Sequence, residues 1–230
     1  MYGFFFSQSG LIFIGIPVLV AMWAQFRVSS AFAKYTRIRA SSNLTGAETA
    51  REILNAAQIH DVEVVEVNGF MGDHYDPGSK RLCLSSETFN TPSLAAVGIA
   101  AHEVGHAIQH ARAYAPLKAR MAIVPVTQIA SNLLPFIVVG AFWFHMLALI
   151  NLGILVYLVL TIFQLITLPV EYDASRRAKI ILQQMSIVQP GEEAEGVNRM
   201  LNAAALTYVA AFIAALGNLL WLIGMSRRNN

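Results

Sequence analysis

Three long stretches of the chain are apolar and carry no charged side chain. Asp, Glu, Lys and Arg are absent from residues 1–26, 121–170 and 200–226. A transmembrane helix needs about 20 predominantly apolar residues, so the first and last stretches can each hold one span. The 50 residues of the middle stretch can hold two. The pattern therefore predicts a protein that crosses a membrane four times.

We place the predicted spans at residues 4–26, 122–142, 148–169 and 203–225. The first span could instead be a signal peptide, but no basic residue precedes it and several follow it, which is typical of an uncleaved anchor. Small residues fill the last span, and small residues let transmembrane helices pack closely. A homo-oligomer formed through these helices is therefore compatible with the sequence.

The charged residues gather in two segments between the spans. We divide the chain into an N-terminal transmembrane anchor (1–26), a first extramembrane segment (27–121), a transmembrane hairpin (122–169), a second extramembrane segment (170–202) and a C-terminal transmembrane helix (203–225).

Basic residues are distributed unequally across the predicted membrane. Of the 16 Lys and Arg, 14 lie in the two extramembrane segments and only Arg227 and Arg228 lie on the other side. The positive-inside rule predicts a multi-pass protein of the cell membrane, with both segments cytoplasmic and both termini outside. The net charge is only +2, and the basic residues lie near span ends. We therefore expect contact with the lipid bilayer and not with a nucleic acid.

The first extramembrane segment contains two signals for the start of a helix. Thr45 followed by Glu48 forms a capping box and predicts a helix over 46–57. Thr91 is an N-cap residue followed by a proline, and it predicts a second helix over 92–114.

Two short stretches between these helices are typical of β-strands. Residues 62–67 are rich in β-branched side chains, and residues 80–85 alternate in polarity after a Pro-Gly turn at 76–79. The chain is therefore predicted to be a mainly α integral membrane protein, with four transmembrane helices and a small α+β domain outside the bilayer.

The sequence His-Glu-Val-Gly-His at residues 102–106 lies in the second predicted helix. His102 and His106 are four residues apart, so they share one helix face. Two neutral imidazoles presented in this way can bind one Zn²⁺. Glu103 follows the first histidine, where a carboxylate can accept a proton from a zinc-activated water. The alternative is a helix with two hydrogen-bonded histidines and no metal.

A catalytic zinc needs a third protein ligand and an open position for water. His110 lies on the same face as His106, but a helix places its Cα about 12 Å from that of His102. A straight helix cannot easily bring all three onto one ion. The metzincin spacing is excluded, because it requires a histidine where this chain has Arg112.

The remaining candidates for the third ligand follow the third predicted span. The middle apolar stretch crosses the membrane twice, so it returns the chain to the side that holds His102 and His106. Glu171, on a helix leaving the bilayer, can complete a two-histidine, one-glutamate zinc site. Asp173 is the alternative ligand, and Glu171 would then be a solvated interfacial charge.

Three motifs resemble those of a known family. They read His-Glu-Val-Gly-His-Ala-Ile-Gln at 102–109, Asp-His-Tyr-Asp-Pro at 73–77 and Pro-Val-Glu-Tyr-Asp-Ala-Ser at 169–175. Together they look like the membrane-bound neutral zinc metallopeptidases of the YugP type, and the resemblance covers most of the chain. It implies a gluzincin-like integral membrane peptidase of bacteria, with a zincin-like catalytic domain and with Glu103 as general base.

We therefore predict a zinc-dependent endopeptidase with one catalytic Zn²⁺ that cleaves peptide or protein substrates, membrane proteins among them. The tetrahedral oxyanion needs a donor besides zinc. We favour His74 because it lies in the shared 73–77 motif, although it could equally be a turn histidine. The other candidates for this donor are Tyr75, Tyr172, Arg176 and Arg177.

The chain is more distantly similar to the membrane zincins that process prenylated proteins or degrade damaged membrane proteins. In those proteins an aspartate four residues after the glutamate ligand supports a ligand histidine. This chain has Ser175 at that position. Either Ser175 makes a weaker hydrogen bond to the histidine, or Asp173 reaches the site through a non-ideal turn.

A peptide substrate is held economically by pairing with an exposed sheet edge. The strand at 81–85, just before the helix with the two histidines, is our predicted edge. The alternative is an ordinary hairpin packed on the helix.

Two other functions are open alternatives. A site-2-type intramembrane protease would hold the motif inside the bilayer, but only residues 94–101 form an apolar run before it, and no Asp-Gly dipeptide is present to supply that class's later ligand. A non-catalytic zinc-binding membrane scaffold usually has a closed site of four Cys or His ligands, and the chain has a single Cys.

Overall fold

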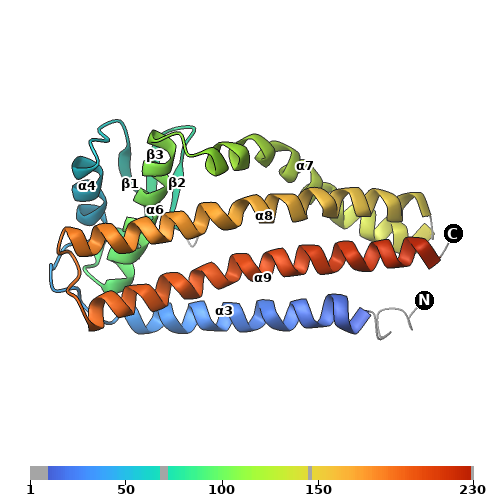
Figure 1. Cartoon of the computed structure of the whole chain (residues 1–230), viewed down its shortest axis with the longest axis horizontal. Coiled ribbons are helices and arrows are strands. Elements are labelled where there is room, and N and C mark those ends of the chain that lie inside the picture. The colour runs from blue at the N-terminus through green and yellow to red at the C-terminus, as the bar shows by residue number, and fades with distance from the viewer. Residues whose placement is uncertain (1–9, 68–71, 145–146, 229–230) are drawn as a thin grey trace. The chain divides into compact units, whose positions relative to one another are not determined.

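The computed structural model describes residues 10–67, 72–144 and 147–228, which form helices and one small sheet (Figure 1). The described chain makes two compact units, each assembled from separate segments. The apolar unit contains Met1–Gln25, Ala119–Leu168 and Leu206–Asn230, and the mixed unit contains Phe26–Lys118 and Pro169–Ala205.

Among the described residues, four helices are long and apolar enough to cross a membrane. They are α3 (Ile16–Tyr35), which continues the π-helical turn η1 (Leu11–Gly15), α7 (Ala115–Phe144), α8 (Leu147–Gln184) and α9 (Glu192–Arg228). The prediction of four spans agrees with these helices, although residues 4–9 of the first predicted span lie outside the described residues.

Helices α8 and α9 are longer than the predicted spans within them. The third span was expected over 148–169, yet α8 continues through Pro169 to Gln184. Proline removes one backbone hydrogen bond of a helix, but it does not end this one. Residues after the proline therefore belong to the same helix as the predicted span before it.

Large apolar side chains point outward from the helices of the apolar unit. Phe136 and Trp143 of α7 are both 76% exposed, and Leu155 of α8 is also exposed. Inside the unit, Ala130 and Ile137 of α7 pack with Val156 of α8. An exposed apolar surface of this extent is costly in water and ordinary in lipid, which agrees with a membrane protein.

Part of the small-residue surface of α9 is used within the chain. A Cβ added to Gly217 would lie 2.4 Å from the backbone oxygen of Phe13, so only glycine allows this approach. A homo-oligomer through the remaining small residues stays a prediction.

The mixed unit contains a three-stranded sheet of strands β1 (Glu63–Val67), β2 (His74–Asp76) and β3 (Arg81–Ser85). The strand order is β1-β3-β2. Strand β1 pairs with β3 in parallel, and β2 pairs with β3 in antiparallel orientation. The prediction that 81–85 is a sheet edge is therefore wrong, because β3 is paired on both sides. Sequence reasoning missed β2, which is short, polar and adjacent to a turn.

Three helices pack around this sheet, namely α4 (Gly46–Ala56), α5 (Ser86–Asn90) and α6 (Leu94–Ala111). The predicted capping box of α4 is confirmed. The predicted N-cap of α6 is wrong: Ser93, and not Thr91, accepts a hydrogen bond from the Ala96 N–H, at 3.1 Å. The Thr91 hydroxyl donates instead to the backbone oxygen of Glu87, at 2.8 Å, because the short helix α5 lies directly before it.

Helix α6 is the centre of the mixed unit. It contacts α4, α5, β2 and β3, and most of its residues are buried. The core around it also includes buried residues of α8 and α9, among them Ala178, Leu182, Val197 and Leu201. The position of α6 is therefore determined from several sides, which a precisely placed functional site requires.

Candidate metal centre

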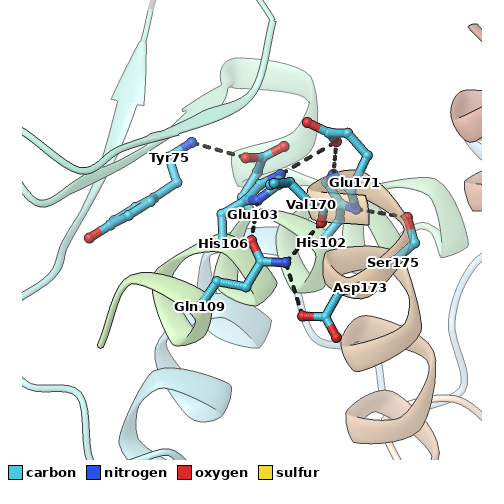
Figure 2. A network of polar contacts seen from close by, with 9 residues as sticks. All are labelled: Tyr75, His102, Glu103, His106, Gln109, Val170, Glu171, Asp173 and Ser175. Atoms are coloured by element: carbon cyan, nitrogen blue, oxygen red, sulfur yellow. Dashed lines mark hydrogen bonds and ion pairs between the residues drawn. The ribbon is translucent and has the colours of Figure 1, made fainter. Parts of the chain in front are cut away.

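Three potential metal ligands from two helices converge in the mixed unit. Nε2 of His102 and Nε2 of His106, on α6, lie 3.2 and 3.5 Å from Oε2 of Glu171, on α8. One ligand atom from each residue lies within 4.8 Å of the others. Figure 2 shows the two imidazoles and the carboxylate facing one another. Glu171 is only 2% exposed.

These residues fit a zinc ion in both spacing and charge. A tetrahedral zinc with ligand bonds of about 2.0–2.1 Å separates neighbouring ligand atoms by about 3.3 Å, close to both distances from Glu171. Burial lowers the pKa of His106, but the hydrogen bond to Glu171 and the charge of Glu103 outweigh burial and raise that pKa above its ordinary value. The site thus favours a positive charge between the imidazoles and the carboxylates.

The two helices meet at Gly105, between the two histidines. A Cβ added to Gly105 would lie 2.8 Å from the backbone oxygen and 3.1 Å from the Cα of Ala174 on α8. Real Cβ atoms do not approach backbone that closely, so a glycine is required here. This contact brings Glu171, three residues before Ala174, within reach of His102 and His106. A glycine inside a helical pattern often has such a packing reason, and this signal could have been found in the sequence.

Gln109 determines the orientation of the His106 ring. The Gln109 side-chain nitrogen donates to the backbone oxygen of Val170 at 2.8 Å and to Asp173 at 3.0 Å. Both partners can only accept, so the amide oxygen faces Nδ1 of His106, at 3.0 Å. Nδ1 must then carry the hydrogen, which leaves Nε2, on the side of Glu171, as the nitrogen available to a metal. Gln109 is fully buried, and sequence reasoning gave it no role.

Ser175 and Asp173 both support the cluster, by different routes. The Ser175 hydroxyl lies 3.1 Å from Nδ1 of His102, and Asp173 reaches His106 through Gln109. The Asp173 carboxylate also accepts from Arg176 at 2.7 Å and from Arg177 at 2.5 Å. Among the described residues, the group able to hold a metal consists of His102, His106 and Glu171, without Asp173.

Glu103 lies beside the cluster and is held by the sheet. Its Oε2 accepts a hydrogen bond of 2.9 Å from the backbone N–H of Tyr75 on β2, as Figure 2 shows. Burial raises the pKa of Glu103 above its ordinary value, while the imidazoles of His102 and His106 act in the opposite direction. The edge strand β2 thus contacts the carboxylate next to the candidate ligands.

Two other histidines considered from the sequence have different surroundings. His74 is exposed on β2, and its Nδ1 lies 3.0 Å from the backbone oxygen of Gly72. His110 has its Nδ1 2.9 Å from the Tyr75 hydroxyl, and that ring packs against it at a centroid distance of 5.9 Å. Neither is part of the cluster of His102, His106 and Glu171.

The chain is similar to known proteins over most of its length. A family model described as "Putative neutral zinc metallopeptidase" matches residues 10–227. A protein of Bacillus subtilis (strain 168) named "Putative membrane protease YugP" is 46% identical over 210 residues, which cover 91% of this chain and 93% of the relative. No solved structure was found to match the chain.

We expect Gly105→Ala to weaken zinc binding by at least about tenfold, because a supporting shell that is loose by about 1 Å disables a metal site. The added Cβ must displace the α8 backbone at Ala174, which moves Glu171. Zinc affinity is measured on the purified protein by competition with a chelator. Gly98→Ala is the matched control on the same helix, since its Cβ would meet side chains and no backbone, with the flexible end of Met200 nearest and Val197 at 3.4 Å. Equal zinc affinity in both variants would contradict this role of Gly105.

Gln109→Met keeps the side-chain volume and removes the hydrogen bond to His106. Loss of a partner that orients a ligand histidine costs about 10–100-fold in metal affinity, and we expect a loss in this range. The same chelator competition measures it, with Gln183→Met on the exposed side of α8 as control. Unchanged affinity in Gln109→Met would show that Gln109 does not orient the ring.

Proposed function

Because the chain belongs to this family of neutral zinc metallopeptidases, we propose that it is a membrane-embedded zinc-dependent endopeptidase with one catalytic zinc ion. The convergence of two imidazoles and one carboxylate beside Glu103 is the observation that carries the proposal. Two histidines and a glutamate are the ligands of a thermolysin-like catalytic site.

In this proposal His102, His106 and Glu171 hold the ion. A zinc ion with an open position supplies Lewis acidity, which polarises a carbonyl and makes water more acidic. Glu171 contributes the negative charge that offsets the ion, and its burial keeps bulk water from competing for it. Gln109 and Ser175 hold the rings so that both Nε2 atoms face the ion.

Glu103 is the proposed general base. The Tyr75 N–H holds one of its carboxylate oxygens at 2.9 Å, which orients the carboxylate beside the ligands. Glu103 accepts a proton as water attacks the peptide carbonyl, and later donates that proton to the leaving amine. A base that is fixed before substrate arrives loses little entropy in the reaction.

The outer edge of β2 is the proposed position for an extended peptide. Strand β2 is at one end of the sheet order β1-β3-β2, so this edge has no strand partner among the described residues. Pairing with a sheet edge gives main-chain hydrogen bonds to any sequence. The Tyr75 N–H lies on this edge next to Glu103, so a paired peptide would bring its carbonyl to the base. Peptides and proteins, membrane proteins included, are the proposed substrates.

The sidedness of the protein is a further part of the proposal. The excess of basic residues in 27–121 and 170–202 supports a cytoplasmic position for these segments and an external position for both termini. The peptidase site would then act on cytoplasmic or juxtamembrane peptide bonds.

Replacement of Glu103 by Gln separates catalysis from metal binding. We expect Glu103→Gln to retain zinc and to lose hydrolysis of casein by about 10²–10⁴-fold, because the amide cannot accept the proton. Glu87→Gln, an exposed position on α5, is the control and should cleave normally. Equal cleavage by wild type and Glu103→Gln would contradict the role of Glu103, and no cleavage by either protein would support the zinc-binding scaffold instead.

His74 is our proposed hydrogen-bond donor to the oxyanion, because it is next to Tyr75 on β2, the strand proposed to pair with the substrate. Removal of one such donor costs about 10²–10³-fold in kcat, so His74→Ala should lower kcat in this range with little change in KM or zinc content. His60→Ala, also exposed, is the control. A normal kcat in His74→Ala would identify His74 as a surface histidine of the turn.

A further inference from the structure

A groove runs between α8 and α9 within the mixed unit. Its volume is about 460 Å³, and its lining includes Pro169 and Tyr172 of α8 and Ala205 of α9 at one end. Its polar lining consists of Asp173, Ser175, Arg176, Lys179 and Asn202. Pockets of about 300–1,000 Å³ accommodate small molecules or parts of larger ones, so this groove can hold a headgroup.

The groove lies where two apolar stretches of the sequence end. Pro169 belongs to the last residues of the uncharged stretch 121–170, and Ala205 to the first residues of the uncharged stretch 200–226. Beyond residue 170 the first charged residues of α8 are Glu171 and Asp173, followed by the basic Arg176 and Arg177. A molecule bound in this groove would therefore contact apolar side chains and charged side chains at the same time. A lipid at the membrane surface has both an apolar and a charged part, so it suits such a site.

The charged wall carries more positive than negative charge. The Asp173 carboxylate accepts hydrogen bonds from both Arg176 and Arg177. One guanidinium is enough to neutralise this carboxylate, so one positive charge is left over. The Arg176 side chain is 68% exposed. Lys179 donates to the neutral amide oxygen of Asn202 at 2.6 Å, and no carboxylate in the described part of the chain lies within 4 Å of its Nζ. Arg176 and Lys179 are three residues apart on one helix face.

We propose that this groove binds the headgroup of an anionic phospholipid. Arg176 and Lys179 contact the phosphate, Asn202 contributes its amide, and the glycerol and first acyl carbons lie against Tyr172 and Ala205. Basic pockets between helices at the cytoplasmic face of a membrane bind anionic headgroups by this combination of contacts.

Lipid binding leaves the metal centre in place. When a phosphate takes Arg176, Asp173 keeps its contacts with Arg177 and with Gln109, so His106 stays oriented. The lipid site therefore goes beyond the peptidase function, and either one can fail without the other. Zinc content reports on the metal centre and lipid affinity reports on the groove.

The test measures binding of phosphatidylglycerol to the full-length protein in neutral detergent by native mass spectrometry. Phosphatidylcholine and inorganic phosphate are the comparison ligands, added at the same concentration. We expect wild type to bind phosphatidylglycerol in preference to both. Equal binding of phosphatidylcholine would mean that acyl chains alone fill the groove, and equal binding of phosphate would make it a free-anion site. Either result overturns the proposal.

The variant R176Q/K179Q removes both basic groups. Each basic side chain near an anionic lipid increases the binding affinity by about tenfold or less. Removal of both side chains should therefore weaken phosphatidylglycerol binding by about 30-fold. Arg199→Gln, which removes one basic charge outside the groove, is the control, since Arg199 pairs with Glu195 on α9 and does not line the groove. Wild-type lipid affinity in the double variant, or an equal loss in Arg199→Gln, overturns the proposal.

If the double variant loses zinc, the single variant Lys179→Gln tests whether the groove binds anionic lipid. Lys179 contacts only a neutral amide in the described structure, so its replacement leaves the contacts of Asp173 unchanged. The single variant should keep one zinc per chain and bind phosphatidylglycerol about fivefold more weakly. Unchanged affinity in this variant counts against the site.

Discussion

The close contact between α6 and α8 at Gly105 is the constraint on which the site depends. The backbone of α8 lies against the one position of the motif that has no side chain. With the helices this close, a carboxylate from α8 can reach two imidazoles on α6. Any larger residue would separate the helices, even though all three candidate ligands would still be present in the sequence.

Buried polar side chains then set the direction of each imidazole. Gln109 and Ser175 hydrogen-bond to Nδ1 of His106 and His102 respectively. Gln109 also ties α6 to Val170 and Asp173 of α8, so the same residue joins the helices and orients the ring. A buried amide is costly unless its hydrogen bonds are made, and here each of its groups has a partner. The network therefore resists both rotation of the ring and separation of the helices.

The sequence identified the parts of the protein that depend on local chemistry. The four apolar spans, the Thr45 capping box and the two histidines with Glu171 all follow from periodicity, charge and spacing along the chain. It could not identify features that depend on tertiary contacts. Strand β2 forms because β3 offers a second edge, and the edge assignment of 81–85 failed for the same reason. The role of Gln109 depends on which residues of α8 face it, which spacing along α6 does not reveal. A glycine inside a helical pattern indicates close packing at Gly105, but it does not reveal that the partner is Ala174.

Membership of a family of neutral zinc metallopeptidases and the geometry of the site lead to one claim: a single zinc ion is held by His102, His106 and Glu171. Zinc X-ray absorption spectroscopy on the purified protein tests it most directly. The account predicts one zinc per chain with two imidazole nitrogens and carboxylate oxygen at about 2.0–2.1 Å, and loss of the imidazole signal in His102→Ala/His106→Ala. A spectrum without imidazole ligands, or one unchanged by this double replacement, would contradict it.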